Sequence, residues 1–182
     1  MIVTAALIVA ALIVAILVYA ATKPSTFRYE RSAAIKAAPE AIYPLINDLR
    51  SHGSWNPFDQ DPDTKRHFDG APSGKGSVYE WEGDRKAGAG RLEITESVPA
   101  SRVQMTLDMK RPMACHNTVE FTLRPQAGVT NVTWALYGPQ PYMAKLMGTF
   151  INCDKMCGSQ FELGLANLKQ IAEQRGVERL AG

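Results

Sequence analysis

The sequence predicts an α+β domain in which a curved antiparallel sheet of about seven strands wraps around one long C-terminal helix, preceded by a single transmembrane helix. Three observations carry this prediction. Residues 2–21 form one uncharged apolar run. Seven later stretches alternate apolar and polar residues in the period of a β-strand, and a final segment returns to the helical period. The 182 residues, 46% of them apolar, suffice for one domain with a substantial core.

The N-terminal run is long enough to cross a bilayer. At about 1.5 Å per residue, a helix over these residues measures about 30 Å, the thickness of one hydrocarbon core. A cleavable signal peptide usually has a basic start and an apolar core of roughly 7 to 15 residues, whereas no Lys or Arg precedes this run. We therefore predict an uncleaved anchor over residues 1–22. A signal peptide remains the alternative, because Val18-Tyr19-Ala20 offers small residues at a spacing that a signal peptidase accepts.

The residues after the run favour a cytoplasmic domain. Residues 23–26 form a short polar linker, and the first charges are Lys23, Arg28 and Arg31 against one acid, Glu30. Basic flanks tend to stay on the cytoplasmic side of a membrane. We expect a single-pass membrane protein with its domain on the cytoplasmic side, and an exported domain as the alternative.

The cysteines and the net charge limit the classes of partner. Cys115, Cys153 and Cys157 are an odd number without the spacing of a disulfide framework, which favours reduced thiols. Cys153 and Cys157 are four residues apart and would share one face of a helix, and His116 is a third candidate ligand from elsewhere in the chain. These residues do not complete the ligand set of a zinc site. We therefore predict no metal and no cofactor. A net charge of +2 with scattered Lys and Arg predicts no nucleic-acid partner.

The domain is expected to begin at Phe27 with a strand. Residues 27–36 alternate between a mainly apolar and a polar face. Pro39 then suits the first turn of a short helix. The apolar residues of this helix recur at helical spacing: Ile42, Leu45, Ile46 and Leu49.

Six further strands are predicted, with turn residues between them. Each has one apolar and one polar face, so the sheet needs a cover on its apolar side. The glycine-rich stretch GDRKAGAG, residues 83–90, predicts the hairpin between the second and the third of them. The strands are Lys65–Asp69, Ser77–Glu82, Gly90–Val98, Arg102–Met109, Asn117–Leu123 and Thr130–Tyr137.

A C-terminal helix supplies that cover. Asp154 to Arg175 has apolar residues at helical spacing, with Asp154 suited to its first turn and Gly176 suited to ending it. The apolar residues are Phe161, Leu165, Leu168 and Ile171 or Ala172.

Together these segments resemble the START-like superfamily, and within it the polyketide cyclase/dehydrase-type SRPBCC proteins. The resemblance covers roughly residues 27–173 and rests on the stretches AAPEAIYPLINDLRSHGSWNPF, YEWEGDRKAGAGRLEITESVP, TNVTWALYGP and FELGLANLKQIAE. It implies a helix-grip fold over residues 27–176, with a short tail at 177–182. It also implies that the segment starting at Trp55 crosses the mouth of a cavity between the sheet and the long helix.

The resemblance and this architecture favour a membrane-tethered domain that binds a lipid or another hydrophobic small molecule in that cavity. Ordinary core packing is the alternative for its lining, because any core between a sheet and a helix contains such side chains. The candidate ligand-binding residues are Trp55, Phe58, Tyr79, Trp81, Leu92, Ile94, Met105, Leu107, Phe121, Trp134, Leu136, Tyr142, Met147, Phe150, Phe161 and Leu165.

Two groups of these residues are expected to form a lid. Trp55 and Phe58 lie in a proline-containing loop, and Tyr142, Met147 and Phe150 follow the last strand. Loops that carry aromatic residues over an apolar cavity commonly gate ligand entry. We therefore expect the two groups to lie side by side at the rim and to close on the ligand.

The second candidate function is a polyketide cyclase/dehydrase-like enzyme acting on an apolar substrate. The histidines, His52, His67 and His116, lie in or near predicted loops, without a Ser or Cys and an acid at a recognisable spacing. No catalytic residue is assigned, and the prediction leans away from an enzyme.

The loop after Trp55 is rich in aspartate. Its spacing lacks the glycine and the terminal glutamate of a calcium-binding loop. We therefore expect solvated turn acids at Asp59, Asp61, Asp63 and Asp69.

Overall fold

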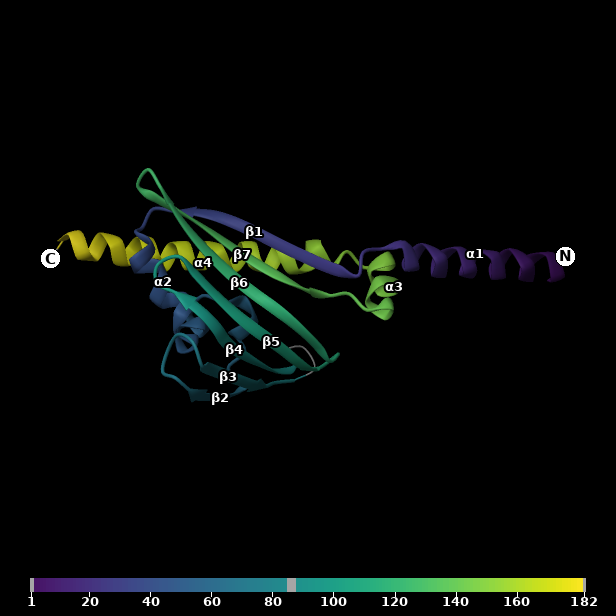
Figure 1. Cartoon of the computed structure of the whole chain (residues 1–182), viewed down its shortest axis with the longest axis horizontal. Helices are drawn as coiled ribbons and strands as arrows, with labels where there is room; N and C mark the ends of the chain where they lie inside the picture. Colours follow the sequence, from purple (N-terminus) through teal and green to yellow (C-terminus); the bar gives the residue numbers. More distant parts are fainter. Residues whose placement is uncertain (1, 85–87, 182) are drawn as a thin grey trace.

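The computed structural model describes residues 2–84 and 88–181 (Figure 1). Its seven strands form one antiparallel sheet in the order β1-β7-β6-β5-β4-β3-β2, so that β2 to β7 follow one another as a meander and β1 joins at β7. The predicted antiparallel sheet around a long C-terminal helix is confirmed. The strands are β1 (Thr26–Ile35), β2 (Lys65–Gly70), β3 (Ser77–Glu82), β4 (Ala89–Val98), β5 (Arg102–Arg111), β6 (Cys115–Gln126) and β7 (Val129–Pro139).

Helices stand at both ends of the sheet's sequence and between its first two strands. α1 extends away from the domain, while α4 runs along the sheet (Figure 1). They are α1 (Ile2–Thr22), α2 (Pro39–Asn47), the short 3-10 helices η1 (Leu49–Ser54) and η2 (Pro57–Asp59), α3 (Tyr142–Phe150) and α4 (Cys153–Ala181).

The inner face of the sheet is apolar, as the strand alternation predicts. In β6, Val119, Phe121 and Leu123 are buried, whereas the residues between them are half-buried. Phe121 lies opposite Trp134 of β7 in the register of the two strands. Because β3 to β7 each bury side chains on this face, it forms one continuous wall that α2, η1 and α4 cover, whereas the edge strand β2 is mostly exposed.

Polar contacts hold α4 against the edge strand β1. The Arg31 guanidinium donates to both carboxylate oxygens of Asp154, at 3.1 Å each, and to Glu162 at 3.0 Å. Further along the helix, Lys169 Nζ donates to the carbonyl oxygen of Ala34 at 2.9 Å. These contacts fix the direction of α4 along β1 and so close one side of the interior.

Gly176 does not end the C-terminal helix, because α4 continues to Ala181; a single glycine inside a helix costs only about 1 kcal/mol, and the residues after it include good helix formers. The hairpin predicted at residues 83–90 joins strands that do pair, β3 and β4. Its residues 85–87, like Gly182 at the end of the predicted tail, lie outside the described residues.

Gly164 of α4 lets the helix approach the sheet closely. A Cβ atom at this position would lie 2.7 Å from Cζ3 of Trp134 and 2.9 Å from Cδ of Pro57. Neither the indole nor the proline ring can yield easily inside a packed interior. The absence of a side chain at Gly164 therefore sets the distance between α4 and the aromatic wall.

We predict that Gly164→Ala lowers the free energy of unfolding by about 1–3 kcal/mol, because overpacking outweighs the helix propensity of alanine. The matched control is Gly148→Ala in α3, where the nearest atom, Nε2 of Gln140, lies 3.8 Å away. That variant should be neutral or more stable. Thermal unfolding of the full chain in detergent measures both, and equal effects of the two substitutions would contradict the prediction.

Candidate functional site

Five aromatic rings form the centre of the interior. They come from the η1–η2 segment (Trp55 and Phe58), from β6 and β7 (Phe121 and Trp134), and from α4 (Phe161). Trp134 stacks on Phe161 with ring centroids 4.5 Å apart, and Trp55 meets Trp134 edge-on at 5.5 Å. Aromatic pairs in such geometries add to the energy of burial alone. Sheet, loop and helix thus meet at one aromatic cluster.

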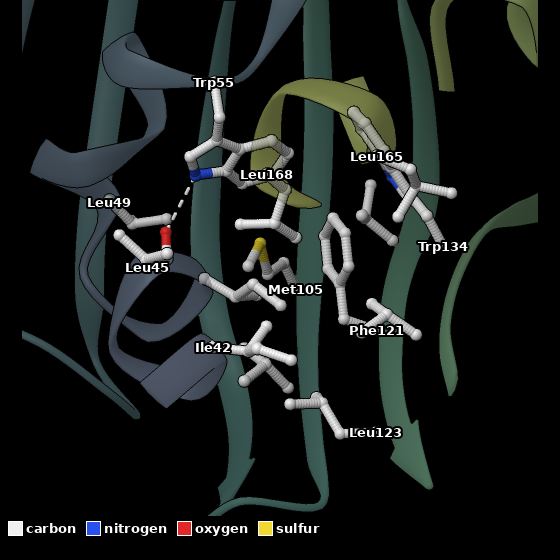
Figure 2. Close-up of a cluster of buried hydrophobic side chains, with 14 of the residues drawn as sticks. Ile42, Leu45, Leu49, Trp55, Met105, Phe121, Leu123, Trp134, Leu165 and Leu168 are labelled. Carbon is white, nitrogen blue, oxygen red and sulfur yellow. Dashed lines mark hydrogen bonds between the residues drawn. The ribbon is translucent and has the colours of Figure 1, made fainter. Parts of the chain in front are cut away.

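Trp55 lies inside this cluster and not at a rim. Its exposed fraction is 0%, and its indole Nε1 donates to the carbonyl oxygen of Leu45 at 2.9 Å (Figure 2). Asn167 of α4 in turn donates from Nδ2 to the Trp55 carbonyl at 3.1 Å. The rim placement of Trp55 is therefore wrong. The η1 turn points the ring inward, where its one polar atom finds a partner in the last turns of α2.

Phe58 is the place where the cluster reaches the surface. Its side chain is 55% exposed, yet its ring lies edge-on to Trp134 at 6.2 Å and to Phe161 at 6.3 Å. The η2 turn that carries it is capped by Asn56, whose Oδ1 accepts from the Phe58 amide at 3.1 Å. Phe58 thus covers the aromatic wall from outside, as the predicted rim position requires.

Two buried polar atoms beside the cluster have no hydrogen-bond partner within the described residues: Nε1 of Trp134 and Nδ1 of His52. His52 Nε2 lies 2.9 Å from the carbonyl oxygen of Ile46 and must donate to it, so Nδ1 holds a lone pair. Complete burial lowers the pKa of His52, although its bond to Ile46 and the nearby Asp59 and Asp48 carboxylates oppose this effect. The imidazole is therefore neutral near pH 7.

Asp59 is part of a buried polar network and not a solvated turn acid. Its Oδ1 accepts from Arg66 Nε at 2.8 Å and from the Tyr79 hydroxyl at 2.6 Å. Arg66 also donates to the carbonyl oxygens of Asp59 and Asp61. Burial, followed by the bond to Asp59, raises the pKa of Tyr79. The network ties the η2 loop to β2 and β3, and all of its charged groups are paired.

The other candidate residues on the sheet and α4 divide by burial. Most are buried in the core, and three pack half-buried against it. The buried ones are Tyr79, Leu92, Ile94, Met105 and Leu165, and the half-buried ones are Trp81, Leu107 and Leu136. The structure thus brings these side chains together on one wall, and contact with a ligand stays a prediction for all of them.

The three candidates of the expected lid on α3, Tyr142, Met147 and Phe150, lie elsewhere. α3 packs against α1 (Figure 1), and the Tyr142 hydroxyl donates to the carbonyl oxygen of Leu17 at 3.0 Å. The reason is the antiparallel pairing of β1 with β7, which places the end of β7 beside Thr26 and hence beside the end of α1. The expectation that this segment lies beside Trp55 is wrong.

Two of the hollows in residues 2–84 and 88–181 have a defined lining. One of about 680 Å³ runs along α1. The other, of about 470 Å³, lies at one end of strands β2 to β5 and is lined by Trp81 and Gly90 together with charged residues. Neither lies between the sheet and α4, where aromatic and aliphatic side chains from the sheet, α2 and α4 pack into one cluster (Figure 2). A ligand in that interior would have to displace side chains.

The three cysteines are free and are not grouped into a metal site. Cys115 is exposed, and Cys153 and Cys157 are half-buried near the start of α4; all three are free. Across residues 2–84 and 88–181, no three His, Cys, Asp or Glu side chains are grouped so that they could hold a metal ion.

A model of the family described as polyketide cyclase/dehydrase and lipid transport matches residues 26–173. No curated protein matches the sequence. Several solved structures have the same fold. One is protein CV1439 from Chromobacterium violaceum, with a TM-score of 0.57 and 17% sequence identity; the match covers 83% of this chain and 99% of that chain. The Aha1 dimer from Colwellia psychrerythraea also has a TM-score of 0.57, at 18% identity and with 81% and 96% covered.

Protein MLL2253 from Mesorhizobium loti is similar at a TM-score of 0.56, with 20% identity over 82% of this chain and 97% of that chain. At such identities these structures speak for the fold alone. The family match shows which family the chain belongs to, because it spans the sheet and most of the long helix that covers it.

We predict that His52 makes stability depend on pH. Its pKa lies below 6.5 in the folded chain, so the unfolded chain binds more protons in acid. The contribution of His52 to the free energy of unfolding should therefore have its full value above pH 6.5. Below pH 6.5 the free energy of unfolding should fall by up to about 1.4 kcal/mol per pH unit, until the pH reaches the pKa of His52 in the folded chain.

The measurement is thermal or denaturant unfolding between pH 7.5 and pH 4.5, compared with His52→Gln, which keeps a donor for the Ile46 carbonyl. The variant should show a smaller loss in acid than the native chain. His67→Gln on the exposed strand β2 is the control and should keep the native slope, since His52 is still present. Identical profiles for His52→Gln and the native chain would refute the prediction.

Proposed function

This chain belongs to the polyketide cyclase/dehydrase and lipid transport family, and we propose that it binds a lipid or another hydrophobic small molecule between its sheet and α4 while α1 tethers it to a membrane. The observation that carries the proposal is the cluster of five aromatic rings, four of them buried and the fifth, Phe58, half-exposed. The ligand would enter there.

Phe58 suits the part of a gate. More than half of its side chain is already in water, so its movement gives up little packing. Behind it lie the stacked rings of Trp134 and Phe161, which would offer a flat apolar surface to a ligand. Displacing one partly exposed ring costs far less than opening a buried layer of side chains.

The unpaired Trp134 Nε1 bears on the chemistry of the ligand. A buried donor without an acceptor costs about 1–3 kcal/mol, and a ligand oxygen that reached it would remove that cost. The ligand class that fits is a mainly apolar molecule carrying a carbonyl or carboxylate oxygen. Lipid esters, fatty acids and polyketides all have this character.

The tether is supported by how α1 joins the domain. α1 is long and apolar enough to cross a membrane, with a mean hydropathy of 3.0 in its most apolar window. Length and composition also fit a signal sequence. However, Ala20 is fully buried, and α3 packs against α1, where the Tyr142 hydroxyl donates to the carbonyl oxygen of Leu17 at 3.0 Å. Cleavage after Ala20 would remove packing on which α3 rests, which favours an anchor, with the domain proposed on the cytoplasmic side.

A second candidate function is a cyclase/dehydrase-like enzyme, which needs an acid or base that can reach the ligand. The observation in its favour is the free lone pair on His52 Nδ1, beside Trp55 with ring centroids 5.0 Å apart. His52→Gln would then abolish turnover and leave binding intact. Retained binding with no turnover in the native chain would exclude it.

We predict that Phe58→Ala weakens binding of a hydrophobic fluorescent probe severalfold with little loss of stability, since the ring is half-exposed. Trp55→Ala should instead destabilise the chain by about 3–5 kcal/mol, because it removes a fully buried ring and its bond to Leu45. Probe titration and thermal unfolding of a chain shortened to begin at Thr26 would measure both effects. Unchanged probe binding in Phe58→Ala would refute the gate.

Mass spectrometry of molecules that co-purify with the same shortened chain from its native host tests the function itself. The expected result is a stoichiometric apolar ligand with at least one carbonyl oxygen. If no such ligand co-purifies and fatty acids, phospholipids and aromatic polyketides all fail to bind, the proposed function is wrong.

We also predict that the full chain stays in the membrane fraction after carbonate and high-salt washing, because a twenty-residue apolar helix cannot be extracted by changing charge interactions. The chain beginning at Thr26 should be soluble. An N-terminus found near Ala21 in the mature protein would show that α1 is a cleaved signal.

A further inference from the structure

Helix α3 presents an apolar stripe that nothing in the described chain covers. Met143, Met147 and Phe150 are spaced four and three residues apart, so they share one side of the helix. Their exposed fractions are 62%, 43% and 71%. Together these three residues, named here the α3 stripe, leave a considerable apolar surface in contact with solvent.

α3 lies at the end of the proposed membrane span. Two hydrogen bonds join it to the last turns of α1 and the residue after it, from Tyr142 to the Leu17 carbonyl at 3.0 Å and from Lys23 to the Gly148 carbonyl at 2.8 Å. α3 crosses the direction of α1 and does not continue it (Figure 1). A helix that crosses a spanning helix at its end lies along the bilayer surface.

The surroundings of the stripe match the chemistry of that surface. The exposed apolar side chains continue to Ile151 and Met156, just past the end of α3. Tyr142 meets α1 at Leu17, two residues before the exposed Tyr19, and tyrosines are enriched where hydrocarbon gives way to headgroups. Lys23 follows the span, and basic residues next to a membrane are attracted to anionic headgroups.

We propose that α3 is an interfacial helix that lies in the headgroup region of the bilayer crossed by α1, with the α3 stripe turned toward the acyl chains. This inference rests on the tether proposed above and adds an orientation to it. The end of the sheet where β1 begins and β7 ends then faces the membrane. The β6–β7 hairpin, at the other end of these strands, points away from it.

Continuity with α1 is the reason for choosing lipid as the occupant. An apolar stripe that is exposed to water does not stabilise a helix of nine residues, whereas burial of the stripe in lipid does. When α1 is inserted in a membrane, the bilayer lies next to α3. A second copy of the chain is the other possible cover, and the experiment below distinguishes the two.

The test uses the full chain with Cys115, Cys153 and Cys157 replaced by Ser, reconstituted in vesicles of phosphatidylcholine and phosphatidylglycerol. One cysteine is then introduced for a nitroxide label as Phe150→Cys, with Val9→Cys in α1 as the lipid control and Gln126→Cys in the hairpin as the water control. Collision with oxygen, which dissolves in lipid, is compared with collision with a water-soluble nickel complex.

The Phe150 label should collide with oxygen in preference to nickel, as the Val9 label does, and the Gln126 label should show the reverse. If the Phe150 label behaves like the Gln126 label while the Val9 label stays in lipid, the tether stands and the α3 inference is wrong. If the Val9 label is also in water, the tether and the inference both fail. Spin–spin broadening between Phe150 labels, lost on dilution with unlabelled chain, would show a second copy on the stripe and also overturn the inference.

A second measurement keeps all native cysteines. Phe150→Glu should free α3 from the lipid, so amide hydrogen exchange over Tyr142–Phe150 in vesicles should become at least tenfold faster than in the native chain. Gln126→Glu is the matched control and should leave that exchange unchanged. Equal exchange in the Phe150→Glu and native chains, at equal melting temperature, would count against the inference.

Discussion

The burial of one tryptophan holds α2, α4 and the sheet together. Trp55 gives its indole N–H to Leu45 of α2, accepts a hydrogen bond from Asn167 of α4, and sets its ring against Phe121 and Trp134 of the sheet. A large ring with one polar atom can be buried only if that atom is paired. The positions of α2, the η1–η2 segment and α4 against the sheet are therefore mutually dependent.

The pairing of β1 with β7 is the second constraint, and it determines what lies at each end. Because the two strands are antiparallel, the chain enters the sheet beside the point where it leaves it, with Thr26 opposite Pro139. α1, which precedes β1, and α3, which follows β7, are thus neighbours despite the long stretch of chain between them. The fold itself gathers the apolar helix and the α3 stripe at one end.

Local patterns could predict the seven strands, the two terminal helices and α2, but they missed the helix α3 and did not show which elements are neighbours. Alternation revealed the strands and their inner faces, since burial on a sheet has a period of two. The Asp59–Arg66–Tyr79 network could not be foreseen, because it needs the register of β2 against β3 as well as the fold of a loop. The predicted position of α3 beside Trp55 was wrong for the same reason, because it depends on which strands pair. Trp55 was placed in the right segment but at the wrong depth, because composition does not show which way a turn points a ring.

Helix α4 connects the proposed membrane-facing end of the domain with the proposed gate at Phe58. Its first residue, Cys153, follows the apolar end of α3 after two residues, and Phe161 lies eight residues further, which is roughly 12 Å at the rise of an α-helix. Phe58 covers Phe161 from outside. If α3 rests among headgroups, a molecule leaving the bilayer needs to pass only about two turns of α4, with exposed Met156 on the way, before it meets the gate. A tether that fixes this end toward the membrane therefore shortens the path through water that an apolar ligand must take, which is the main barrier to its transfer.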